Sequence, residues 1–82
     1  MSKKAKQWFY MTDEQIGRLA GQGTHPGALE AWERARKIRE AGKTPSIYYS
    51  EFNGFRVINE DDPEEFKIGL SIRGQAKFFR GC

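Results

Sequence analysis

Two segments of this sequence carry residue types that could support catalysis. Gly42-Lys43-Thr44 resembles the end of a phosphate-binding loop, but that loop needs a glycine where Lys37 stands and a helix where Pro45 stands. We therefore interpret Gly42 as the residue that ends a helix. His25 is the only histidine; neighbouring Thr24 is a weak candidate for a nucleophile, and no Ser/His/Asp pattern accompanies them. These observations predict that the protein is not an enzyme.

The acidic residues gather in one short segment. Residues 60–65 contain five acids and no base, so a divalent cation is one possible ligand. However, the alternating acids and central glycine of a calcium loop are missing. One cysteine and one histidine are also too few for a four-ligand zinc site. We predict a solvated acidic loop with no metal and no cofactor, and contact with a basic partner is the alternative.

Aromatic and basic side chains alternate along the predicted strands. An exposed aromatic patch beside an arginine is typical of a protein–protein interface. The sequence therefore predicts a small non-enzymatic protein that docks on a protein partner as an inhibitor, adaptor or regulator, of the kind common among phage and bacterial accessory proteins. Its expected docking residues are Tyr48, Phe52, Phe55 and Arg56. If one apolar sheet face stayed uncovered, a homodimer would also be possible.

The alternative is a nucleic-acid-binding protein. The net charge is only +3, but the basic residues are in excess at both ends of the chain, on either side of the acidic segment. Bases could stack on the sheet aromatics while lysines and arginines contact phosphates. The expected phosphate-binding residues are Lys3, Lys4, Lys6, Lys67, Arg73, Lys77 and Arg80.

Length and composition limit the number of domains and the expected location in the cell. A chain of 82 residues is long enough for one small domain, here residues 1–82, with 1–6 as a flexible basic start and 7–80 as the folded core. A single cysteine excludes an internal disulfide and fits a reducing compartment. No apolar run is long enough for a membrane span, and no signal peptide is recognisable. We therefore expect a cytoplasmic protein that does not contact a membrane.

The first half of the chain predicts a strand followed by two helices. Residues 7–11 are aromatic-rich, which favours a strand. Thr12 and Gln15 have the spacing of a capping box, so a helix is expected to begin there and to end at Gly21 or Gly23. A second helix is predicted from about residue 26 to 41, with Thr24 or His25 as its cap, because its apolar residues recur at helical spacing.

Residues 46–59 predict a β-hairpin. Asn53-Gly54 is the strongest short turn signal, since both positions of this turn need positive φ. A two-residue turn would pair Phe52 with Phe55 and Tyr49 with Ile58. One face would then hold Tyr48, Phe52, Phe55 and Val57, and the other would hold Ile47, Tyr49, Ile58 and the Glu51–Arg56 pair.

The last part of the chain has two possible interpretations. Phe66, Ile68, Leu70 and Ile72 alternate with polar residues, which favours a strand over 66–73. Asp62 and Pro63 would instead suit a helix start, but the alternation and Gly69 favour the strand. Residues 75–80 are expected to form a short final strand. The whole is an α+β fold of order β-α-α-β-β-β-(β), with a mostly antiparallel sheet and two helices packed on one face.

Overall fold

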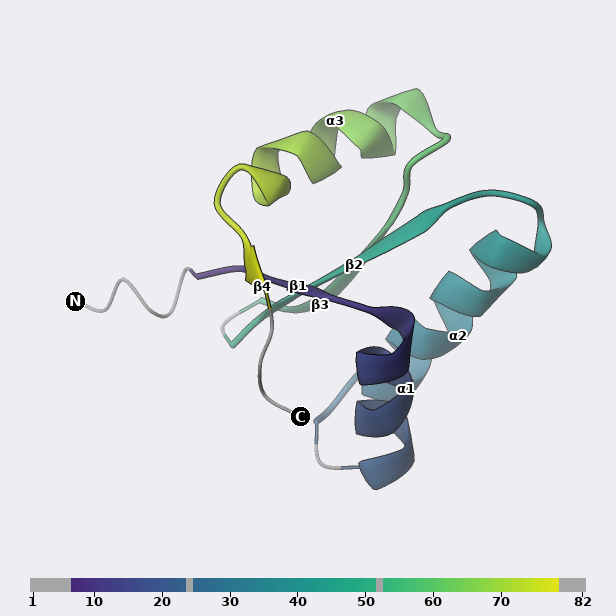
Figure 1. Ribbon diagram of the computed structural model, residues 1–82, viewed down its shortest axis with the longest axis vertical. Helices are drawn as coiled ribbons and strands as arrows, with labels where there is room; N and C mark the ends of the chain where they lie inside the picture. The colour runs from purple at the N-terminus through teal and green to yellow at the C-terminus, as the bar shows by residue number, and fades with distance from the viewer. Residues whose placement is uncertain (1–6, 24, 52, 79–82) are drawn as a thin grey trace.

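The computed structural model describes residues 7–23, 25–51 and 53–78. A four-stranded sheet has the order β3-β2-β1-β4, and three helices pack on it (Figure 1). Strands β1 and β3 both pair antiparallel with β2, whereas β4 pairs parallel with β1. The predicted α+β class with a mostly antiparallel sheet is confirmed. The elements are β1 (Phe9–Met11), α1 (Asp13–Gln22), α2 (Ala28–Glu40), β2 (Pro45–Ser50), β3 (Gly54–Asn59), α3 (Pro63–Arg73) and β4 (Lys77–Phe78).

Helix α1 begins at the predicted capping box. The Gln15 amide donates to Thr12 Oγ1 at 3.2 Å, and the Thr12 amide donates to Gln15 Oε1 at 2.9 Å. Gly23 ends the helix with a φ of 69°, in the left-handed region that glycine adopts without strain. The N-cap residue of helix α2 is Gly27, with a φ of 86°, and not His25 as expected. Thr24, the other expected cap, lies outside the described residues.

Removing the capping hydroxyl should weaken the whole domain. Thr12→Ala is expected to lower the free energy of unfolding by about 1 kcal/mol, because the Gln15 amide loses its acceptor. Urea unfolding followed by circular dichroism measures this loss. Thr44→Ala is the matched control, since Thr44 is exposed and caps no helix among the described residues. Equal losses in both variants would contradict the capping role.

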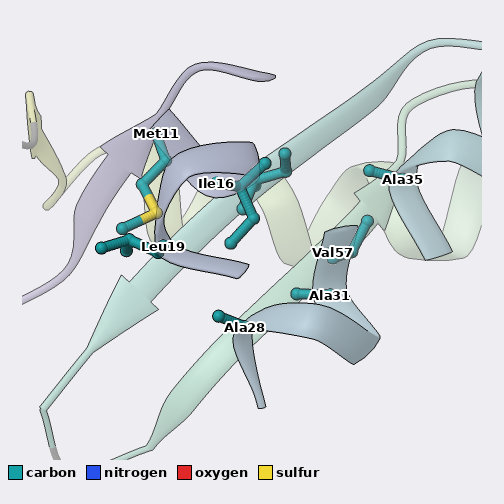
Figure 2. Packing of buried hydrophobic residues seen from close by; sticks show 8 residues of the cluster. Met11, Ile16, Leu19, Ala28, Ala31, Ala35 and Val57 are labelled. Atoms are coloured by element: carbon teal, nitrogen blue, oxygen red, sulfur yellow. The ribbon is translucent and has the colours of Figure 1, made fainter. Parts of the chain in front are cut away.

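Helices cover both faces of the sheet. Helices α1 and α2 lie on one face, and α3 lies on the other (Figure 1). The larger core lies under α1 and α2, where Figure 2 shows side chains from both helices meeting the sheet. The smaller core lies under α3 and contains Tyr48, Ile58 and Ile72. The expectation that only one sheet face would be covered is therefore wrong. The larger core consists of Met11, Ile16, Leu19, Ala28, Ala31, Ala35, Ile47 and Val57.

The predicted hairpin register is also wrong. Tyr49 lies opposite Phe55 and Ser50 lies opposite Gly54, so residues 51–53 form a three-residue connection. Gly54 follows this connection with a φ of 76°, in the left-handed region that glycine adopts without strain. The register differs from the prediction by three residues. An odd shift moves side chains to the other face, so Phe55 and Val57 share a face with Ile47, and Arg56 shares one with Tyr48.

The predicted strand over residues 66–73 is helix α3. Asp62 caps it by accepting from the amides of Glu64 and Glu65, and Pro63 occupies the first turn. Of the four apolar residues expected to point inward, only Ile72 is buried. Gly69 is the other buried residue of this helix. The observed order is therefore β-α-α-β-β-α-β.

Candidate binding groove

Strand β3 lies at one edge of the sheet, and part of that edge carries no neighbouring strand in the described structure. The Val57 carbonyl accepts from Arg34 Nε at 3.4 Å, and the Asn59 amide donates to Glu65 Oε1 at 2.8 Å. Both backbone groups therefore point away from β2. Backbone direction alternates along a strand, so the amide and carbonyl of Phe55 and the amide of Val57 face the same open edge.

A groove of about 510 Å³ runs along this edge. Helix α2 forms one wall, and α3 forms the other with Glu65 and Ile68. Arg34 of α2 pairs with Glu65 of α3 at 3.1 Å, which joins the two walls near the end of β3. We call this site the β3 groove. It is lined by Gly27, Glu30, Ala31, Arg34, Phe55, Arg56, Val57, Ile58, Glu65 and Ile68.

The two walls of the β3 groove differ in charge. Arg56 is exposed on the α3 side of β3, because it lies opposite Tyr48, which packs beneath α3. No carboxylate of the described residues forms an ion pair with Arg56. Glu65 is held by Arg34 and by the Asn59 amide, so its charge is compensated within the fold. Glu30 brings a negative charge to the α2 wall.

The structure brings together two of the four predicted docking residues. Phe55 and Arg56 both line the β3 groove. Phe55 is half-buried and packs against the larger core and Tyr49, with ring centroids 4.7 Å apart. The prediction of Tyr48 as a docking residue is wrong, because its side chain is 0% exposed. The observed register places its ring under α3. Phe52 lies outside the described residues.

Of the predicted phosphate-binding residues, the three in the described part of the chain lie on α3 and β4. Lys67 is exposed on α3. Arg73 and Lys77 line a second hollow of about 460 Å³ together with Tyr10. Lys3, Lys4, Lys6 and Arg80 lie outside the described residues.

Arg73 is engaged within the fold. Its Nε donates to the Tyr48 hydroxyl at 3.2 Å, and its guanidinium pairs with Glu60, which also accepts from the Ser46 hydroxyl. The hydrogen bond from Arg73 to Tyr48 and the nearby Glu60 carboxylate raise the pKa of Arg73 above its usual value. This arginine stays charged at physiological pH and ties α3 to the sheet.

Sequence reasoning assigned only Phe55 and Arg56 to the groove and missed its other lining residues, among them Arg34, Glu65 and Ile68. Ile68 was expected in the core but is 40% exposed, and Phe66 and Leu70 on the same helix are 38% and 49% exposed. The Asp62-Pro63 helix start was the available signal, since residues at every second position, such as Phe66, Ile68, Leu70 and Ile72, cannot all share one face of a helix. The Arg34–Glu65 pair spans 31 residues of sequence, so no local pattern indicated it.

Other classes of site find no support in the described part of the chain. Among those residues, no three histidine, cysteine, aspartate or glutamate side chains are grouped to hold a metal ion. None of the helices in residues 7–23, 25–51 and 53–78 is both apolar and long enough to cross a bilayer. Comparison with protein-family models, curated proteins and solved structures finds no match to this chain.

Proposed function

We propose that this protein acts by docking on another protein through the β3 groove, as an inhibitor, adaptor or regulator. The observation that carries the proposal is an open strand edge lying between two helices. Open edges invite pairing with another chain, and proteins commonly use them to capture extended segments. The exposed Ile68 and Arg56 beside this edge supply an apolar and a charged contact.

The nucleic-acid alternative has weaker support. Of its seven basic residues, Lys67, Arg73 and Lys77 are described, and Arg73 is already paired with Glu60. Phosphate binding needs several free cations on one surface. The single cysteine fits a reducing compartment, so we place the docking activity in the cytoplasm.

Capture from a cell lysate tests the groove. Ile68→Asp places a charge on the α3 wall and should abolish retention of the partner, because a carboxylate would have to be desolvated against apolar groups. The matched control is Leu29→Asp, since Leu29 is also an exposed aliphatic residue on a helix, 53% exposed, but lies outside the groove. Circular dichroism should show both variants folded.

The outcome that supports docking is a protein retained by the wild type and by Leu29→Asp but not by Ile68→Asp. A protein retained equally by all three would contradict docking in the β3 groove. Retention of nucleic acid that is lost at about 200 mM salt would favour the alternative function instead.

A further inference from the structure

We infer that the β3 groove accepts an extended, acidic segment of another protein, which adds to the sheet as a fifth strand beside β3. This inference rests on the proposed function and specifies the partner's chemistry at the same site. It combines the direction of the free backbone groups on β3 with the side chains that flank them.

The backbone of β3 limits where a strand can add. Arg34 and Glu65 already bind the Val57 carbonyl and the Asn59 amide. Within the described residues, the edge groups left without a partner are therefore the amide and carbonyl of Phe55 and the amide of Val57. They are spaced two residues apart on one edge, which matches the hydrogen-bonding repeat of an incoming strand. A short segment centred opposite residues 55–57 would satisfy them.

The α3 wall selects the charge of that segment. Arg56 projects on this side, and none of the described residues forms an ion pair with it. A carboxylate opposite Arg56 would gain a charge-assisted hydrogen bond. Ile58 and Ile68 line the groove beside it, so the residue two places along the partner, which projects to the same face, should be apolar.

The α2 wall requires a different side chain. Phe55 and Val57 project on this side of β3, and Ala31 lines the wall above them. Glu30 on the same wall repels a carboxylate. The partner residues on either side of the acid should therefore be apolar, so that one acid alternates with apolar side chains.

A second copy of this chain fits the edge less well. Pairing of two β3 strands about a two-fold axis at the centre of residues 55–57 would set the two Arg56 side chains directly opposite one another. Like charges in this position destabilise strand pairing. The same residue that attracts an acidic partner therefore disfavours self-association at the groove.

Synthetic peptides test the inference. The probe is a fluorescein-labelled nonapeptide, Gly-Ser-Val-Glu-Val-Ile-Val-Ser-Gly, titrated with the full chain and followed by anisotropy. It should bind on the order of tenfold more tightly than the same peptide with lysine in place of glutamate. Only the glutamate can form a charged hydrogen bond with Arg56, and losing about 1.4 kcal/mol with such a bond corresponds to a tenfold change in Kd. N-methylation of the two valines that flank the glutamate should abolish binding, because it removes the amides that face Phe55 and Val57.

Charge reversal in the protein supplies the matched variant. Arg56→Glu should prefer the lysine peptide, whereas Arg18→Glu, the same change on an exposed face of α1, should keep the preference of the wild type. An unchanged preference in Arg56→Glu, equal binding of both peptides, or tight binding of the N-methylated peptide would overturn the inference. So would a wild-type dimer in sedimentation velocity that Ile68→Asp dissociates, since a second copy would then occupy the groove.

Adding the peptides to the lysate capture separates the two proposals. Displacement of the captured protein by the glutamate peptide supports both. Capture that depends on Ile68 but is displaced by neither peptide overturns the acidic strand and leaves docking intact. Capture that survives Ile68→Asp overturns docking in the groove itself.

Discussion

Tyr48→Ala should lower the free energy of unfolding by about 3–5 kcal/mol, as deletion of a large buried ring usually does. The ring is 0% exposed and packs with Ile58 and Ile72 beneath α3. Its hydroxyl accepts a hydrogen bond from Arg73, so the substitution also removes a tie between α3 and the sheet. A chain of this size is stable by only about 4–12 kcal/mol, so the substitution should remove a large part of the free energy of unfolding.

Urea unfolding of Tyr48→Ala and Tyr48→Phe distinguishes packing from hydrogen bonding. The phenylalanine variant keeps the ring and loses only the contact with a half-exposed Arg73, so its loss should be about 1 kcal/mol. If Tyr48→Ala kept the free energy of unfolding of the wild type but lost its captured partner, the ring would be a docking residue, as the sequence suggested, and not part of the core.

The local signals in the sequence were reliable for the first half of the fold. The capping box at Thr12 and Gln15 and the helical spacing of Ala28, Ala31 and Ala35 depend on residues within one or two turns of each other. Such interactions can be recognised from neighbouring residues without knowledge of the tertiary structure. Helix α2 accordingly falls within the predicted range of residues 26–41.

The hairpin register could not be derived from turn chemistry alone. Gly54 supports a two-residue turn at Asn53-Gly54 and a three-residue connection equally well, because both place a glycine at positive φ. The two-residue turn would put Tyr48 and Phe55 on the same face of the sheet. The three-residue connection puts them on opposite faces, because the register shifts by an odd number of residues. The choice between them depends on packing against α2 and α3, which no local pattern contains.

The β3 groove was predictable only in part. Phe55 and Arg56 were recognised because an aromatic residue next to an arginine is a local feature. Arg34, Glu65 and Ile68 reach the groove from two helices on opposite faces of the sheet. Their roles depend on α3 being a helix. The alternation of Phe66, Ile68 and Leu70 concealed this, because it fits a strand as well as a helix that exposes apolar residues.

Gly69 gives the clearest test of how α3 packs. A Cβ atom at this position would lie 3.1 Å from Ile58 Cγ2, so the glycine allows the helix to approach β3 closely. Gly69→Val should therefore lower the free energy of unfolding by about 1–3 kcal/mol through overpacking. Any outward shift of α3 would also move Glu65 and Ile68, so the variant should bind the glutamate peptide more weakly than the wild type.

Gly21→Val is the matched control, because Gly21 also lies in a helix but a Cβ there meets no atom within 4 Å. Valine is the better helix former, so this variant should be as stable as the wild type or more stable by a few tenths of a kcal/mol. Ile58→Ala would create space under Gly69, so Gly69→Val should cost less in that background than in the wild type. Equal costs in the two backgrounds would show that contact with Ile58 does not determine the position of α3. The Arg34–Glu65 and Arg73–Glu60 ion pairs would then hold α3 in its position beside the groove.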